Sequence, residues 1–557
     1  MKPIFLNSKS KIQIPKSARS VLFLLLGGLL FRGFVAFWLY PGFDEAYYYV
    51  YSLNLDWSYF DHPVLVALLT GFGPWLTGEV SQFTIRLGAL ILHTGSLILL
   101  YLTSAKLFSE KAAKITLAIA TIVPIFQIAF GILTLPDGPL MFFWTASLYC
   151  AAQEFFPNSQ FPIPNSQFPI PNSPYYRPSY RLAILGILVG LACLGKYHGF
   201  VLGFGFVGFC FASSRYRPAL LSPWAWLGIA LFILTIFPIW FWNIQHDWVS
   251  FGFQLNRGVP QREFNLLNVG LVFLAGVAYL FPTFGLPLWW VSWRSVQAQI
   301  QPFFSKKLST EQDDFQQKQL LILWVSLPLT LGFTLMGGYQ QILPTWPMPG
   351  FWSLTLLLGQ QAVIWQQQSR RWVQRWLKGS GLIIGTALLL ALLHITTGTL
   401  QSGSQYALLG GFWHPQDDPS TELIDIQQLR RGFAESPHLS QALQDSSFIF
   451  TNGYYLGGQI AMALTPLNPT PITCFASDMR GFAFWSKRDR WLGKDALYIT
   501  LDRFYRKKDL TERYRDYFSS LQEIGTVPIR RGGGVIEIVH VLQAKTLLKP
   551  YPRPYGI

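Results

Sequence analysis

The chain has 557 residues, of which 51% are hydrophobic and only 13% are charged, and its formal net charge is +15. Ordinary soluble domains have about 25% charged residues, so this composition excludes a disordered chain and argues against a water-soluble enzyme. The basic residues are spread thinly between long apolar runs, a distribution that does not predict nucleic-acid binding.

Long apolar segments predict a polytopic α-helical membrane protein. A basic N-terminus (1–20) precedes an apolar run over about 21–40, which is too long for a signal-peptide core and has no small-residue cleavage site after it. A straight span needs roughly 20 residues, and three of the apolar segments are shorter: 139–154, 182–195 and 199–213. We expect about 11 membrane spans, with a range of roughly 10 to 13 that reflects these short segments. The ten further spans are predicted near 82–103, 115–132, 139–154, 182–195, 199–213, 222–242, 266–291, 320–337, 346–364 and 380–399.

The distribution of basic residues predicts the orientation of these spans. With a cytoplasmic N-terminus, the cytoplasmic segments contain 20 Lys and Arg residues, whereas the loops on the opposite side contain 3. Cytoplasmic loops carry the excess of Lys and Arg in membrane proteins. An odd number of spans then places everything after about 400 on the extracytoplasmic side.

Three segments differ from the spans. The cytoplasmic loop 155–181 repeats PNSQFPI and is too rich in proline for helix, so we interpret it as low-complexity sequence. Segment 64–77 is apolar but short, and it is expected to lie in the interface or to re-enter rather than to span. From 400 to 557 charged residues become frequent, and the strand-like runs 447–451, 496–501 and 534–542 predict an extracytoplasmic α/β or α+β domain. The domains expected are thus 1–20, 21–399 and 400–557.

The loop after the first span (41–81, the first loop) contains the strongest chemical signal. It contains carboxylates and no Lys or Arg to pair with them. A carboxylate can remove a proton from a hydroxyl group in general-base catalysis, and aromatic faces stack on sugar rings. An interfacial aromatic belt with solvated acids is the alternative interpretation. The candidates are Asp44, Glu45, Asp56, Asp61 and His62, together with Tyr47, Tyr48, Tyr49, Tyr51 and Tyr59.

Further candidates lie in loops that are predicted on the same side of the membrane as the first loop. Asp137 lies in a Pro-Asp-Gly-Pro turn, which is also the composition of a simple turn. Lys196 is unusual on a face otherwise poor in basic residues; it either snorkels at a helix end or binds an anion such as a lipid phosphate. The loop 243–265 contains His246 and Asp247, a weak metal or structural signal. Arg257 and Arg262 follow in the same loop.

Six motifs, in order, resemble one family: FDEAYYYVYS, YFDHP, LPDGPLMFFW, GKYHG, NIQHDWVSF and LPTWPMPG. They are similar to the bacterial membrane glycosyltransferases of the ArnT-like and protein O-mannosyltransferase-like superfamily, which have the GT-C fold (glycosyltransferase families 39 and 83). The resemblance covers about 30–350, and it extends more loosely to the C-terminal domain.

The resemblance implies an enzyme of the plasma membrane that transfers a sugar from a polyprenyl-phosphate carrier to an envelope lipid, glycan or protein, with inversion. It implies catalytic roles for Asp44, Glu45 and Asp137. It places Lys196 at a basic position near the donor phosphate. The chemistry of the other residues makes them further candidates for binding the donor phosphate or sugar: Tyr48, Tyr59, His62, Arg257 and Arg262. His62 stands where aminoarabinose transferases carry a lysine, and Tyr47 where they carry an arginine. These departures weigh against transfer of aminoarabinose to lipid A.

The sequence does not decide whether the site binds a metal ion, and it allows two other classes of function. A cation must offset the charge of a leaving phosphate, and a basic side chain or a bound divalent ion can supply it. Asp61, His246 and Asp247 are the possible metal or structural residues. The alternative function is a transporter or flippase, although such proteins usually show internal repeats and ionisable residues at mid-membrane. A membrane-anchored binding protein is a third possibility, and it leaves the acids of the first loop without a role.

Overall fold

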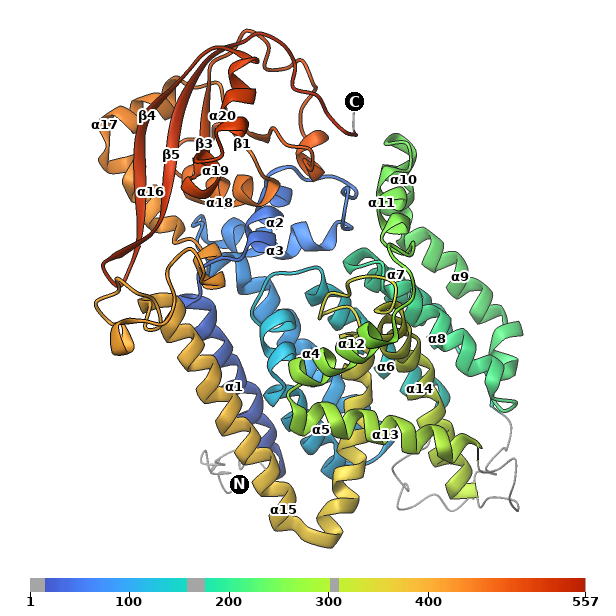
Figure 1. Ribbon diagram of the computed structural model, residues 1–557. Coiled ribbons are helices and arrows are strands. Elements are labelled where there is room, and N and C mark those ends of the chain that lie inside the picture. Colours follow the sequence, from blue (N-terminus) through green and yellow to red (C-terminus); the bar gives the residue numbers. More distant parts are fainter. Residues whose placement is uncertain (1–15, 158–175, 301–309, 556–557) are drawn as a thin grey trace, which may run out of the picture.

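The computed structural model describes residues 16–157, 176–300 and 310–555. It has a helical part and a C-terminal part in which the named strands lie, at the top of Figure 1. This architecture confirms the predicted fold class, a polytopic helical protein followed by an α/β or α+β domain. Most of the low-complexity loop 155–181 lies outside the described residues.

The helical part consists mainly of apolar helices joined by short connections. Two of its helices, α2 (Phe43–Leu53) and α3 (Leu65–Thr77), lie within the predicted first loop. With 13 residues, α3 is too short to span, in accord with its expected place at the interface. The others are α1 (Lys16–Trp38), α4 (Leu87–Leu107), α5 (Glu110–Ile122), α6 (Asp137–Phe155), α7 (Arg181–Gly195), α8 (Gly199–Ala212), α9 (Pro223–Thr235), α10 (Phe237–Gln245), α11 (Val249–Asn256), α12 (Leu266–Tyr279), α13 (Pro282–Ile300), α14 (Thr310–Met336) and α15 (Met348–Thr397).

Several helices have the length and composition of membrane spans. Within the described residues, four helices are long and apolar enough to cross a membrane, or up to six if each of two bent pairs is one span. The 50-residue α15 is interrupted at Ser369, whose backbone is extended, and Figure 1 shows the helix turning at its base. This break lies between the predicted spans 346–364 and 380–399. The total of about 11 spans stays a prediction.

The C-terminal domain contains a five-stranded mixed sheet in the order β2-β1-β3-β5-β4. Strands β1 (Phe448–Thr451), β2 (Ile472–Cys474) and β3 (Ala496–Leu501) are parallel, whereas β4 (Phe518–Arg531) and β5 (Gly534–Leu547) form an antiparallel ribbon. The predicted strands match β1, β3 and β5. The α-helices of the C-terminal domain are α16 (Ile426–Glu435), α17 (Pro437–Asp445), α18 (Tyr454–Leu464), α19 (Asp502–Tyr505) and α20 (Lys508–Arg515).

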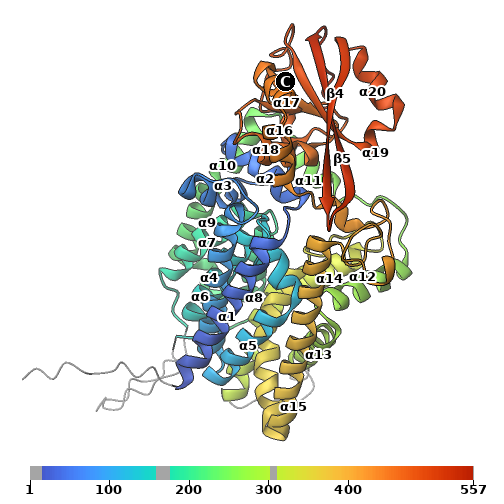
Figure 2. The same cartoon turned by 90° about the vertical axis from the view of Figure 1, so that its left-hand side faces the viewer.

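The C-terminal domain packs directly on α2. Figures 1 and 2 show α2 and α3 between the long helices and the sheet. One hydrophobic core contains buried residues of both parts, among them Tyr47 and Tyr51 of α2 and Ile460 of α18. Arg430 of α16 adds a polar link, because its Nη2 donates a hydrogen bond to the carbonyl oxygen of Val80 at 2.8 Å. The sheet domain therefore covers the first loop.

Close contact between α18 and α2 depends on Gly458. A Cβ atom at this position would lie 2.4 Å from the backbone carbon of Ala46 and from the backbone nitrogen of Tyr47. Two backbones must separate to admit it, because no flexible side chain is available to move.

Replacing Gly458 by alanine is therefore expected to loosen the domain contact and to lower the free energy of unfolding by about 1–3 kcal/mol. Thermal unfolding and limited proteolysis of the C-terminal domain measure this. Gly385→Ala is the matched control, because nothing lies within 4 Å of its added Cβ and alanine favours helix by about 0.5–1 kcal/mol. Equal stability of the two variants would contradict the prediction.

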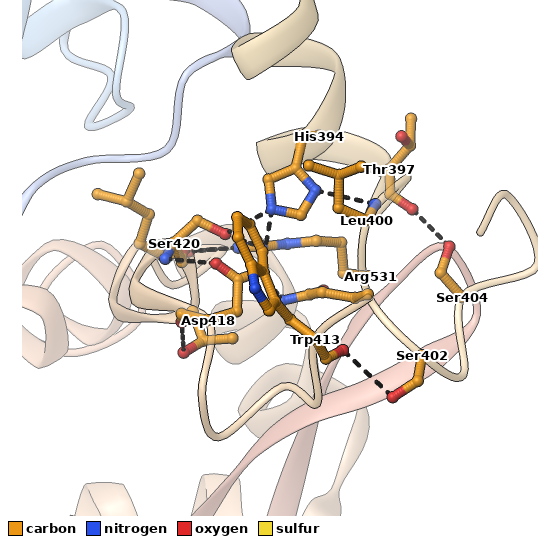
Figure 3. A network of polar contacts seen from close by, with 12 residues as sticks. His394, Thr397, Leu400, Ser402, Ser404, Trp413, Asp418, Ser420 and Arg531 are labelled. Atoms are coloured by element: carbon orange, nitrogen blue, oxygen red, sulfur yellow. Dashed lines mark hydrogen bonds and ion pairs between the residues drawn. The ribbon is translucent and has the colours of Figure 1, made fainter. Parts of the chain in front are cut away.

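A polar network joins the end of α15 to the sheet domain (Figure 3). His394 Nε2 lies 2.9 Å from Asp418 Oδ2, and its Nδ1 accepts a hydrogen bond from the backbone N–H of Leu400 at 3.2 Å. Arg531 of β4 donates to the hydroxyl of Ser420 at 2.7 Å and to its carbonyl oxygen at 2.9 Å. These bonds attach the last helix of the membrane part to the edge of the sheet at a second point, away from α2.

Candidate active site

The first turn of α2 places two adjacent acids in opposite surroundings. Gly42 precedes the helix, and its N–H donates to Glu45 Oε2 at 3.0 Å, which satisfies one of the free donors at a helix N-terminus. Carboxylates are also favoured there by the helix dipole. Successive side chains on a helix point about 100° apart, so Glu45 enters the protein interior while Asp44 stays accessible to solvent.

Glu45 is 1% exposed and fully engaged. Arg86 Nε and Nη2 donate to its two oxygens at 2.8 and 2.6 Å, and the backbone N–H of Thr134 donates to Oε1 at 3.0 Å. Arg86 also donates to the carbonyl oxygens of Ala36, Leu39 and Tyr40. Glu45 thus joins the end of α1, the start of α4 and the turn before α6. These contacts favour a positioning role over the catalytic one expected from the sequence.

Asp44 is reached by solvent yet lies among protein groups and other charges. Burial is the largest influence and raises the pKa of Asp44 above its usual range. The charges of Arg480 and Arg257 act in the opposite direction, and Asp61 and Glu45 add to the increase. A carboxylate with a raised pKa beside accessible space has the properties of a general base.

Asp61 is fully buried and pairs with a residue from the C-terminal domain. Arg480 Nη1 lies 3.1 Å from Asp61 Oδ2, and the hydroxyls of Tyr51 and Tyr47 donate to Oδ1. Tyr47 in turn accepts a hydrogen bond from the backbone N–H of Gly481 at 2.8 Å. Arg480 could not be predicted as a site residue, because it is 419 positions away from Asp61 in the sequence and no local motif marks it.

Asp137 and Lys196 form a second buried ion pair. Lys196 Nζ donates to both carboxylate oxygens of Asp137 at 2.9 Å, and both side chains are below 10% exposed. Asp137 begins α6 and Lys196 follows α7, so the pair ties two helix ends together. The structure thus brings together two residues that the sequence analysis assigned to one face.

The positive charges of three residues act on His62, and these residues are called here the cation cluster: Lys196, Arg257 and Arg480. Burial, followed by these three positive charges, lowers the pKa of His62 well below its usual range. Its Nδ1 is buried and has no hydrogen-bond partner among the described residues, and the same is true of Nε2 of His198. Arg257 lies over the rings of Phe253 and Trp346, and no ion pair for it occurs within the described ranges. Buried polar atoms without partners are uncommon in folded proteins, so these two histidines mark the region as a candidate for ligand binding.

The remaining predicted residues take up several positions around this centre. Tyr48 is buried, and its ring meets that of His62 edge to face at 5.6 Å. Tyr59 stacks on Tyr51 at 3.9 Å and donates to the Tyr51 carbonyl oxygen. These contacts favour packing roles for both tyrosines.

The loop after α10 is more peripheral in its contacts. His246 stacks on Trp242 at 4.0 Å and Asp247 is exposed, with a left-handed backbone. Arg262 donates to the carbonyl oxygen of Gly337 at 2.9 Å. Within the described residues, no group of three or more His, Cys, Asp or Glu side chains has the arrangement of a metal site.

The structure is that of a multi-pass membrane protein in which buried carboxylates and cations lie together beneath a docked sheet domain. Residues 49–252 match the family model of dolichyl-phosphate-mannose-protein mannosyltransferases. Lipid A galacturonosyltransferase RgtD of Rhizobium johnstonii is 24% identical over 357 residues, which cover 61% of this chain and 65% of that protein.

Solved structures share the fold of nearly the whole chain. The structures of ArnT from Cupriavidus metallidurans, in the apo state and bound to undecaprenyl phosphate, each align with a TM-score of 0.58 and 12% identity. The alignments cover 95% of this chain and 98% of ArnT, and they show the fold. The comparisons thus agree with the resemblance that the sequence motifs indicate: residues 49–252 are similar to the mannosyltransferase family, and the chain has the fold of ArnT.

Proposed function

We propose that this protein is a membrane glycosyltransferase that takes a sugar from a polyprenyl-phosphate carrier and transfers it to an envelope lipid, glycan or protein. The observation that carries the proposal is the position of the accessible acid Asp44 beside the cation cluster. An acid to deprotonate an acceptor hydroxyl and cations to receive a leaving phosphate are the two requirements of this transfer.

The reaction follows from these groups as a single displacement. Asp44 removes the proton of the acceptor hydroxyl while its oxygen attacks the anomeric carbon. The bond between that carbon and the phosphate oxygen breaks on the opposite side, and the electron pair leaves with the carrier phosphate. Attack and departure on opposite faces invert the anomeric centre.

Charge at the leaving phosphate increases during this step. The donor phosphodiester carries one negative charge, whereas a phosphate monoester carries about 1.5 to 2 at pH 7. A fixed cation therefore stabilises the transition state and product more than the bound donor, which is the condition for faster chemistry. Arg480 and Arg257 are the candidates, because their positive charges act on Asp44, whereas Lys196 is held by Asp137.

The proposed site faces the extracytoplasmic side. The excess of Lys and Arg in the opposite loops supports this orientation, as does the clustering of the first loop, Asp137 and Lys196 under the C-terminal domain. RgtD is named for the transfer of galacturonic acid to lipid A, and the experiment below identifies the sugar and the acceptor of this protein.

Deletion of the gene, followed by mass spectrometry of envelope lipids, glycans and proteins, tests the proposal. We expect one class of molecule to lose the mass of one sugar, and complementation with the wild-type gene to restore it. Purified protein in vesicles containing the lipid-linked sugar should then release the carrier phosphate and form a product of inverted anomeric configuration. An unchanged profile under all growth conditions would contradict the proposal.

A further inference from the structure

Arg480 is a cation that the C-terminal domain contributes to the centre beneath it. It begins the short helix Arg480–Ala483 between β2 and β3, and its backbone is left-handed with φ +45°. Residues other than glycine rarely adopt this conformation, because their Cβ atom comes too close to the following carbonyl oxygen. Such strain persists where surrounding contacts enforce it, and it is common at binding sites.

The contacts of Arg480 hold its guanidinium group without using all its donors. The group lies 3.9 Å above the ring centre of Tyr454, Nη1 contacts Asp61 at 3.1 Å, and Nε contacts Asp478 at 3.4 Å. No hydrogen bond from Nη2 occurs within the described residues. The side chain is 16% exposed. An arginine fixed on an aromatic ring with a free Nη2 is ready to accept an anion.

Asp44 and His62 indicate where that anion would lie. Arg480 is the charge with the largest effect on Asp44, and it is one of the three cations that act on His62. Lys196 is bound to both oxygens of Asp137, whereas Arg480 contacts one oxygen of Asp61. Arg480 can therefore turn part of its donor set toward a ligand without leaving its own carboxylate unpaired.

We propose that Arg480 binds the phosphate of the lipid-linked donor, so that the docked C-terminal domain completes the donor site. The inference rests on the proposed function and names one of its donor-binding groups. It gives the C-terminal domain a chemical role in addition to covering the first loop. The proposed contact is between the Arg480 guanidinium and phosphate oxygens, which suit each other geometrically.

Binding of undecaprenyl phosphate to the purified full-length protein tests this without requiring sugar transfer. We expect Arg480→Gln to weaken binding by about 10- to 100-fold, the effect of losing a hydrogen bond to a charged group. Arg480→Lys keeps the charge but loses the planar guanidinium group, so its affinity for undecaprenyl phosphate should lie between those of the wild type and Arg480→Gln. Arg490→Gln, an exposed arginine on the same connection, is the matched control and should bind like the wild type.

Asp61→Asn separates ligand binding from a purely structural role by the sign of its effect. Removing the carboxylate frees Arg480 from its competing anion while the asparagine oxygen still accepts the tyrosine hydroxyls, so undecaprenyl phosphate should bind as tightly or more tightly. If the ion pair between Asp61 and Arg480 has only a structural role, Asp61→Asn should instead weaken the binding of undecaprenyl phosphate. Folding of each variant is checked by thermal unfolding.

The outcomes distinguish the inference from the proposed function. Equal binding by wild type and a folded Arg480→Gln variant would overturn the inference alone, and so would weaker binding by a folded Asp61→Asn variant. Loss of binding in Arg480→Gln without any sugar transfer by the wild type would support the inference and contradict the proposed function. Absence of binding by the wild type would overturn both.

Discussion

Replacing Asp44 by asparagine is expected to lower kcat for sugar transfer by about 10²- to 10⁴-fold, the usual contribution of a general base. Asparagine keeps the shape of the side chain but cannot accept the acceptor proton. Burial raises the pKa of Asp44, so the ionised form does not stabilise the folded protein at neutral pH, and the variant should be at least as stable as the wild type. Transfer assays and thermal unfolding of the same preparation measure both effects.

The direction of the pKa shift also predicts a pH profile. Because the pKa of Asp44 lies above its usual value of 3.8, activity should fall as pH decreases through that raised pKa, at a higher pH than an ordinary aspartate would give. The charged groups that act on Asp44 are Arg480, Asp61, Arg257 and Glu45. Arg480 lowers the pKa, so Arg480→Gln should move the acid limb to still higher pH.

Asp56→Asn is the matched control for Asp44→Asn. Asp56 is an exposed acid of the same loop, and it accepts a hydrogen bond from Trp242 Nε1 at 2.9 Å, which an asparagine oxygen also accepts. We expect near-normal transfer from this variant. Full activity of Asp44→Asn, or equal loss in both variants, would show that Asp44 is not the base.

Sequence patterns predicted the parts of this molecule that depend on local periodicity or composition. Long apolar runs located α1, α4 and α14, and short strand-like runs located β1, β3 and β5. Strand β4 was missed, because FSSLQEIGTVPIRR contains polar residues, glycine and proline that are unfavourable in strands. Its pairing with β5 supplies the stability that its own sequence lacks.

The site could be predicted only where a residue lies in a loop between predicted spans. The acids of the first loop, Asp137 and Lys196 were found because the spans and the distribution of basic residues predict these loops on one side of the membrane. Arg480 was missed because only the docking of the C-terminal domain on α2 brings it to Asp61. The difference between Asp44 and Glu45 was equally invisible, since it depends on which side of α2 meets Arg86.

Glu45→Gln is expected to have the opposite effect of Asp44→Asn: a loss of about 3–5 kcal/mol in the free energy of unfolding, the usual result of removing one partner of a buried ion pair. Arg86 is completely buried, and glutamine leaves its charge without a counter-charge. The carbonyl oxygens that Arg86 also contacts satisfy its hydrogen bonds but not its charge. Thermal or denaturant unfolding of the purified variant measures the loss.

Two further variants decide between a positioning and a catalytic role for Glu45. Glu79→Gln removes an exposed charge of the same loop and should change stability by less than about 0.5 kcal/mol. Adding Arg86→Gln to Glu45→Gln should cost less than Arg86→Gln alone, because the second change then removes an already unpaired charge. If Glu45→Gln instead folds with wild-type stability and loses transfer, Glu45 acts in catalysis as its sequence motif implies, and the ion pair with Arg86 is incidental to the fold.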